Sequence, residues 1–324
     1  MPEEYAGMYA TPIQELMDWT MPPSKPLVEG LLSSGVHLLA GSPKIGKSWF
    51  ALWLAVQISR GQPVWNFPTN SCTVLYLALE DTQKRLQKRL IQLYGNECLE
   101  EPIHFALEAQ TADNGLERQL RTFVMHHPDT GLIVIDTLQK ARGTCGISNA
   151  YASDYEVISR LKQLADERNL CILLVHHTRK MPDADPFHTI SGTTGLHGAA
   201  DGALVLHREN RLDHKAVLNC SSRDFPDQRL HLTFGNNGLW TLDEIEREVQ
   251  PKYPPVLEQL AKVLPDHWTG TATELQGLLG IDILPNQLMR ILNAYTDQLL
   301  CNFHIRYLTK RTRQQKLLEL HREA

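Results

Sequence analysis

The stretch GSPKIGKS, at residues 41–48, has the composition of a phosphate-binding loop. Glycines at 41 and 46 let the backbone wrap a phosphate without Cβ clashes, and the backbone N–H groups then point at the anion. In this pattern Lys47 reaches the β- and γ-phosphates of ATP, and the Ser48 hydroxyl ligates Mg²⁺. The predicted nucleotide-binding residues are Gly41, Ser42, Pro43, Lys44, Ile45, Gly46, Lys47, Ser48 and Trp49.

Two carboxylates end apolar segments and suit the remaining steps of phosphoryl transfer. Asp136 closes GLIVID, the position expected for a metal-binding carboxylate. Glu80 closes TVLYLALE and suits activation of the attacking water. Its neighbour Asp81 competes for that role, and we interpret it instead as the N-cap of the following helix. Because the carboxyl ends of parallel strands share one edge of a sheet, Glu80 and Asp136 should converge with Gly41.

Two adjacent histidines, His176 and His177, end another apolar segment. Neighbouring strand residues face opposite sides, so at most one of them points along the nucleotide edge, and the two cannot chelate one metal ion together. A histidine at a strand end is commonly a satisfied polar residue. Its place at this edge also suits a sensor of the γ-phosphate, a role that one of the two histidines could have.

These residues need an α/β scaffold, and the hydrophobic pattern predicts one. Apolar segments typical of buried strands alternate with segments of helical spacing, which indicates a mostly parallel sheet covered on both faces. The expected strands are 36–40, 73–79, 131–136 and 171–177, and the expected helices are 48–59, 81–94 and 155–167. From Ala203 onwards, short strands separated by polar turns predict antiparallel additions to one edge. An acidic, helix-like stretch, DEIEREV, follows them.

PKYPP, at 251–255, marks the best domain boundary. The expected parts are an N-terminal segment 1–30, an ATPase domain 31–248 and a winged-helix-like domain 253–324. In the last part a threonine-capped helix ends at Gly280, and a longer helix over 285–300 precedes a β element with a basic bias.

The longer helix of that domain carries polar residues that can dock DNA, namely Gln287, Arg290 and Asn293. A protein-interaction or oligomerisation role fits such a domain equally well.

The composition restricts the classes of function. A net charge of -5 over 324 residues excludes a chain that coats nucleic acid along its whole length, so any such contact must be local. The N-terminus has no signal-peptide pattern and no apolar run is long enough to span a membrane, so we expect a cytoplasmic protein without a membrane partner. The six scattered cysteines form no CxxC pair, and we interpret them as small buried hydrophobes.

Residues 25–245 resemble the RecA-like ATPase core of hexameric replicative helicases of the DnaB and plasmid RepA type. GSPKIGKS is similar to their phosphate loop, VLYLALEDTQKRLQKRL to the segment with the catalytic glutamate, and LIVIDTLQKA to their Walker B strand. ILLVHHTRK is similar to the strand that carries a polar sensor. The resemblance assigns these roles to Glu80, Asp136 and His177.

SSRDFPDQRLHLTF is similar to the hairpin that supplies an arginine finger to a neighbouring subunit, and it places that finger on Arg223. DnaB-type proteins have a lysine two residues earlier, where this chain has Ser221. The finger is therefore either single or helped by Arg208.

The resemblance also implies a homo-hexameric ring whose channel loops bind single-stranded DNA, and partners such as a replication initiator or primase. Two segments suit the channel loops, 139–150 with Lys140 and Arg142, and 179–197 with Arg179 and Lys180. Ordinary exposed loops with solvated cations fit these segments about as well.

The leading hypothesis from the sequence is an ATP- and Mg²⁺-dependent helicase that acts on single-stranded DNA in the replication of a mobile element. The alternatives are an ATP-switched DNA-binding regulator and a strand-exchange recombinase.

Overall fold

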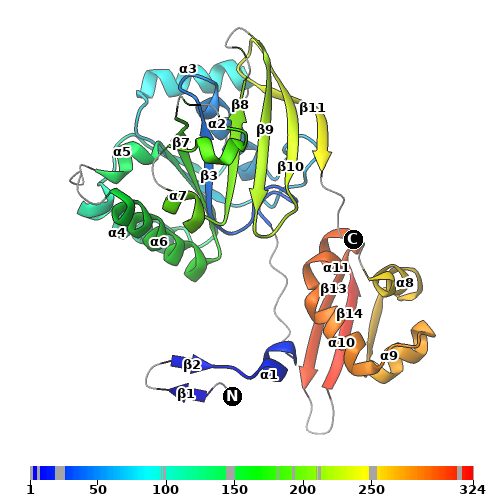
Figure 1. The fold of residues 1–324 in the computed structure, drawn as a ribbon. Helices are drawn as coiled ribbons and strands as arrows, with labels where there is room; N and C mark the ends of the chain where they lie inside the picture. The colour runs from blue at the N-terminus through cyan, green and yellow to red at the C-terminus, as the bar shows by residue number, and fades with distance from the viewer. Residues whose placement is uncertain are drawn as a thin grey trace. The chain divides into compact units, whose positions relative to one another are not determined.

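The computed structural model describes the chain apart from a set of short segments (Figure 1). The segments outside the described part are 1–2, 6–7, 19–25, 96, 98–99, 144–149, 180, 182, 192–193, 209, 211–212, 248–253, 312–315 and 324. The chain divides into two compact units. The larger unit is Pro26–Gln250, and the smaller combines Met1–Lys25 with Pro251–Ala324. Of the expected N-terminal segment 1–30, residues 1–25 therefore belong to the same unit as the C-terminal residues.

Within the described residues, the larger unit holds one nine-stranded sheet of order β11-β10-β9-β8-β3-β7-β6-β4-β5. Its strands are β3 Gly35–Gly41, β4 Thr73–Ala78, β5 Ile103–Ala106, β6 Thr130–Asp136, β7 Cys171–His177, β8 Gly202–His207, β9 Lys215–Ser222, β10 Gln228–Phe234 and β11 Trp240–Arg247. The strands from β8 to β5 run parallel, and β9, β10 and β11 continue the sheet in antiparallel fashion.

Helices cover both faces of this sheet (Figure 1). They are α2 Lys47–Arg60, α3 Gln83–Tyr94, α4 Leu116–His126, α5 Leu138–Arg142, α6 Ala150–Arg168 and α7 Thr194–Ala199, with short 3₁₀ turns at Ala112–Asn114 and Pro186–Thr189. Apolar side chains of α2 and α3 pack on one face, and those of α4, α5, α6 and α7 pack on the other. The predicted class, a mostly parallel α/β core with antiparallel edge strands, is confirmed.

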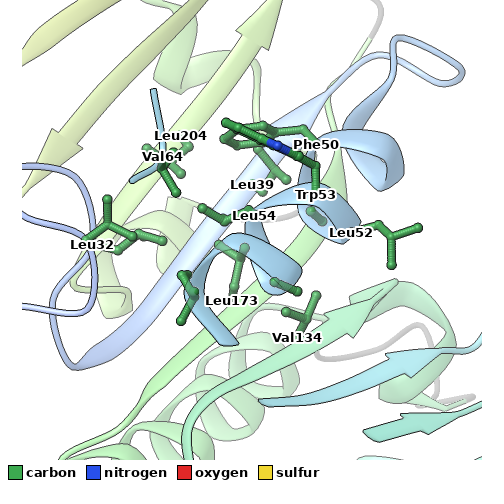
Figure 2. Close-up of a cluster of buried hydrophobic side chains, with 14 of the residues drawn as sticks. Leu32, Leu39, Phe50, Leu52, Trp53, Leu54, Val64, Val134, Leu173 and Leu204 are labelled. Atoms are coloured by element: carbon green, nitrogen blue, oxygen red, sulfur yellow. The ribbon is translucent and has the colours of Figure 1, made fainter. Parts of the chain in front are cut away.

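The helix that follows the phosphate loop is buried on nearly every side. Phe50, Leu52 and Leu54 of α2 are at most 1% exposed, and they lie in the cluster that Figure 2 shows over the central strands. Burying each such side chain stabilises the fold by about 1.5–3 kcal/mol. The Trp65 ring stacks on Phe50 with 5.4 Å between centroids, and its indole N–H donates to the Trp240 carbonyl at 2.7 Å. The start of α2 is thereby held rigidly against the sheet.

Two expectations for the edge of the sheet were wrong. β8 runs parallel to β3, because the chain between β7 and β8 is long enough to return to the same end of the sheet. The acidic stretch DEIEREV lies largely in β11, where Ile245 pairs with Leu230 of β10 and Leu242 pairs with Leu232. Pairing with a neighbouring strand outweighs the helix-favouring composition there.

The smaller unit has a winged-helix-like order of elements. They are α8 Pro255–Val263, β12 His267–Gly270, α9 Ala272–Leu279, α10 Pro285–Ala294, α11 Thr296–Phe303, β13 Ile305–Arg311 and β14 Lys316–Arg322, preceded in the chain by β1 Glu3–Tyr5, β2 Met8–Ala10 and α1 Ile13–Asp18. The three C-terminal strands form a sheet of order β12-β14-β13. A capping box of Thr271 and Glu274 starts α9, and Gly280 ends it. The helix expected over 285–300 is two helices that meet at Tyr295.

Asn293 of α10 is already engaged inside the smaller unit. Its Nδ2 donates to the Met17 carbonyl at 2.9 Å, and its Oδ1 accepts from the Tyr307 hydroxyl at 2.9 Å. The N-terminal helix α1 packs against this part of α10. Asn293 therefore does not present its amide to DNA in this arrangement, whereas Gln287 and Arg290 of the same helix are exposed.

No helix in the described part of the chain is both long enough and apolar enough to cross a membrane.

Candidate nucleotide site

The carboxyl ends of the central parallel strands surround one open pocket of about 370 Å³. Side chains predicted from the sequence line it together, namely Lys47, Ser48, Glu80, Asp136 and His177. They come from the end of β4, from β6, from β7 and from the start of α2, so the chain brings them together only through the sheet. The volume lies in the range of small-molecule sites.

The phosphate loop has the backbone geometry that its glycines permit. A Cβ at Gly41 would lie 2.7 Å from the Leu206 carbonyl oxygen, and Gly46 has a φ of 114° that disfavours any other residue. The Lys47 ammonium donates to the carbonyls of Gly41 at 2.8 Å and Ser42 at 3.1 Å. His177 Nδ1 lies 3.4 Å from the same Nζ atom. These contacts hold the Lys47 cation inside the loop, where a triphosphate would bind.

Burial lowers the pKa of Lys47 to about 8, although the Asp136 and Glu80 carboxylates act in the opposite direction. Phosphates bind the ammonium form and would raise this pKa, so ATP binding above pH 8 must take up a proton. We therefore expect ATP affinity to fall as the pH rises above about 8, by at most about tenfold per pH unit. Titration calorimetry in two buffers of different ionisation enthalpy measures the affinity and the proton uptake. A constant affinity between about pH 7 and pH 9.5 would contradict the expectation.

Asp136 is 5% exposed and is held from two sides. The Tyr76 hydroxyl donates to its Oδ2 at 2.9 Å, and Ser48 forms a second side-chain hydrogen bond with it. Burial raises the pKa of Asp136, while the bonds from Ser48 and Tyr76 and the charge of Arg89 lower it. The contact between Ser48 and Asp136 places two oxygen ligands suited to Mg²⁺ side by side. Tyr76 was not singled out from the sequence, because it reads as one more buried strand residue.

Glu80 and Asp81 have different environments just beyond the end of β4. One carboxylate oxygen of Glu80 accepts from the Thr137 hydroxyl at 2.9 Å, and Glu80 lines the pocket. The prediction that Asp81 is the N-cap of α3 was wrong, because Thr82 caps that helix. The Asp81 carboxylate instead forms ion pairs with Arg85 at 3.1 Å and with Arg89. With Asp81 engaged by two arginines, Glu80 is the better candidate to act on a bound nucleotide.

Arg208, which follows β8, supplies a cation to the protomer's own pocket. Its guanidinium lies over the rings of Trp240 at 4.8 Å and Phe234 at 5.2 Å. Its Nε and Nη2 atoms are buried, and neither finds a hydrogen-bond acceptor within the described residues. Donors left without partners at the rim of a phosphate loop fit an anionic ligand. The sequence suggests Arg208 only as a second arginine beside Arg223. Its place in the pocket could not be predicted, because its neighbour Phe234 is distant in the chain.

Arg223 lies at the end of the strands opposite to the end that carries its own phosphate loop. Its neighbour Ser222 pairs with Gly202, which lies beside His37 near the start of β3, whereas the loop begins at Gly41. From His37 to Gly41 the strand rises by roughly 13 Å, and β9 lies two strands away from β3 in the sheet. The Arg223 side chain is 59% exposed, with its guanidinium 3.4 Å from Asp201. It cannot reach the pocket of its own protomer.

The candidate DNA-contact residues occupy two segments near the nucleotide edge. Lys140 and Arg142 lie on α5, directly after Thr137, and the Lys140 side chain is exposed. Arg179 forms a local ion pair with Asp183 at 3.0 Å. Lys180 lies outside the described residues.

The fold and the pocket together define a RecA-like P-loop ATPase, an enzyme class that binds and hydrolyses ATP. The chain belongs to the AAA domain family AAA_25, whose model matches residues 5–183, more than half of the 324 residues. The matched region holds the phosphate loop, Glu80, Asp136 and His177. It ends before β8, so Arg208 and Arg223 lie outside it.

Two solved structures have a similar fold. One is an ATPase domain, which aligns with a TM-score of 0.55 and 17% identity over 72% of this chain and 96% of that domain. The other is a DnaB-like replicative helicase, solved to show its interactions with primase, which aligns with a TM-score of 0.56 and 18% identity over 68% of this chain and 63% of that one. The expected RecA-like fold of the ATPase core is thus confirmed.

The similar curated proteins are DNA repair proteins named RadA. The one from Streptococcus pneumoniae (strain ATCC BAA-255 / R6) is 25% identical over 182 residues, which cover 56% of this chain and 37% of that protein. The one from Streptococcus pyogenes serotype M1 is 25% identical over 184 residues, which cover 56% of this chain and 34% of that protein. The chain therefore spans about a third of the length of the curated relatives it matches.

Proposed function

We propose that the protein is a ring-forming, DNA-stimulated ATPase that unwinds DNA during replication of a mobile element in the cytoplasm. The observation that carries this proposal is the location of Arg223, which is exposed and lies at the opposite end of the strands from its own phosphate loop. A guanidinium in that position can serve hydrolysis only in the pocket of a second copy. Identical contacts that repeat head to tail form a ring when the rotation between copies closes and a filament when it does not, and the proposal is a closed homo-hexameric ring.

The types of relative support DNA as the partner of this ATPase. The DnaB-like structure is that of a replicative helicase, and the RadA proteins are named for DNA repair. By analogy, single-stranded DNA would lie against α5 and residues 179–197. An initiator or a primase would be a further partner.

The site residues predicted from the sequence each have a definite task in the proposed mechanism. The loop N–H groups and Lys47 would hold the phosphates, while Ser48 and Asp136 would hold Mg²⁺, which neutralises charge on the β- and γ-phosphates when it is bound. Glu80 would orient the attacking water and accept its proton. Arg223 of the next copy would stabilise the charge that develops on the γ-phosphate.

His177 would report loss of the γ-phosphate, since it contacts the same Lys47 ammonium. Burial and the Lys47 charge both lower the pKa of His177, so its ring is neutral at neutral pH and can accept a hydrogen bond.

ATPase activity with and without single-stranded DNA, measured beside the mass in solution, tests the proposal. We expect DNA to stimulate hydrolysis several-fold, and a mass that is a multiple of the 36.8 kDa protomer. A forked duplex with a single-stranded tail should be unwound only while ATP is hydrolysed. A rate of ATP hydrolysis that single-stranded DNA does not change, together with tight binding to one duplex sequence, would favour the ATP-switched DNA-binding regulator instead. Long filaments in place of rings would favour the recombinase.

A further inference from the structure

We propose that Thr137 is the positioning residue of the catalytic Glu80, and that it ties the glutamate to α5, the first candidate DNA-contact segment. The positioning part concerns ATP hydrolysis alone. The link to DNA rests on the proposed function.

The geometry begins where two neighbouring strands end. Ala78 of β4 pairs with Asp136 of β6, and the Leu79 amide donates to the Asp136 carbonyl at 2.8 Å. Immediately beyond this pair, the Thr137 hydroxyl donates to Glu80 Oε1 at 2.9 Å. Thr137 is only 3% exposed, so its hydroxyl has a fixed place in the fold, whereas Glu80 is exposed toward the pocket. Backbone and side-chain bonds together fix the glutamate relative to the metal-binding aspartate.

A fixed Oε1 matters because a glutamate has several rotatable side-chain bonds. A free carboxylate at a strand end would sample many orientations, and few of them direct an oxygen at the attacking water. With Oε1 held by Thr137, Oε2 remains available to the pocket. Thr137 therefore acts through Glu80 and contacts no reacting atom itself.

The backbone of Thr137 also starts α5. Its carbonyl accepts from the amides of Lys140 at 3.0 Å and Ala141 at 3.2 Å. Leu138 and Ala141 are at most 2% exposed and anchor this short helix, whereas the Lys140 side chain is exposed. If a DNA phosphate binds Lys140 and shifts it, the shift would be transmitted to the Thr137 peptide through one turn of helix. Movement of Thr137 would then change the hydrogen bond between its hydroxyl and Glu80.

The variant Thr137→Val tests the positioning role, because it keeps the shape and removes the hydroxyl. We expect kcat without DNA to fall by about 10- to 100-fold with little change in KM. Thr137→Ser should restore most of the activity, and affinity for a fluorescent ATP analogue should be unchanged in both variants. In single-turnover assays of the Glu80→Gln background, Thr137→Val should cause no further loss. A structural defect would lower the rate in either background.

Thr73→Val is the matched control. Thr73 is also 3% exposed and donates to a carboxylate, Asp129, at 2.5 Å, but it lies at the far end of β4. We expect its kcat to match the wild type. A Thr137→Val enzyme with wild-type kcat, or one whose loss persists in the Glu80→Gln background, would overturn the positioning role.

DNA stimulation tests the link to α5. Thr137→Val and Lys140→Ala should each reduce the ratio of DNA-stimulated to basal activity, and the double variant should lose no more than the larger single loss. Independent, multiplicative losses would overturn the link. If the wild type is not stimulated by DNA, the proposed function and the link both fail, while the basal comparison still decides the positioning role.

Discussion

Replacing Arg223 with alanine is expected to lower kcat by about 10³-fold or more, with little change in ATP affinity. A loss of this size corresponds to about 4 kcal/mol of the activation barrier. The reason is geometric. The guanidinium lies at the end of the strands away from its own pocket, so it would act only in the pocket of a neighbouring copy. Steady-state hydrolysis and binding of a fluorescent ATP analogue separate the two effects.

Mixing variants distinguishes action between copies from a structural defect. Arg223→Ala retains an intact pocket and Glu80→Gln retains an intact finger, so mixed assemblies contain some complete sites and should regain activity. The control is Arg229→Ala on β10, since Arg229 is similarly exposed at 63% and forms a 3.9 Å ion pair with Glu246. Its activity should be close to the wild type. Absence of any recovery across all mixing ratios would argue against shared sites.

Replacing Lys47 with alanine is expected to remove measurable hydrolysis and to weaken ATP binding strongly. Lys47 is the buried cation of the phosphate loop, and its loss leaves the β- and γ-phosphates without their central counter-charge. We expect kcat/KM to fall by at least about 10³-fold. The variant loses both an electrostatic contact that stabilises the transition state and a contact that binds ATP in the ground state. Hydrolysis assays at saturating ATP and direct titration measure the two parts.

Lys84→Ala controls for the loss of a positive charge, because Lys84 is an exposed lysine in the first turn of α3. It should hydrolyse ATP at the wild-type rate. A Lys47→Ala enzyme that still binds ATP normally would show that the loop does not hold the phosphates.

Local patterns predicted most of the parallel core. The strand and helix at Gly35–Gly41 and Lys47–Arg60 agree with the pattern to within a residue or two, because a buried parallel strand is apolar throughout. The strands from β8 to β11, at one lateral edge of the sheet, were less predictable. The direction of β8 and the strand at Trp240–Arg247 depend on pairing partners, which composition does not encode locally. The Asp81 cap was wrong because two arginines on α3 attract its carboxylate.

Residue types and their spacing were enough to recognise the phosphate loop and to single out Lys47, Ser48, Glu80, Asp136 and His177 as candidates. The loop and the strand ends that carry these residues are local structures, so a local pattern reveals them. The folded chain was needed to show that Arg208 enters the protomer's own pocket while Arg223 lies at the far edge. It was needed equally to show that Tyr76 and Thr137 hold the two carboxylates. Those relations depend on strand order and direction across the sheet, which are set by contacts between residues far apart in the chain.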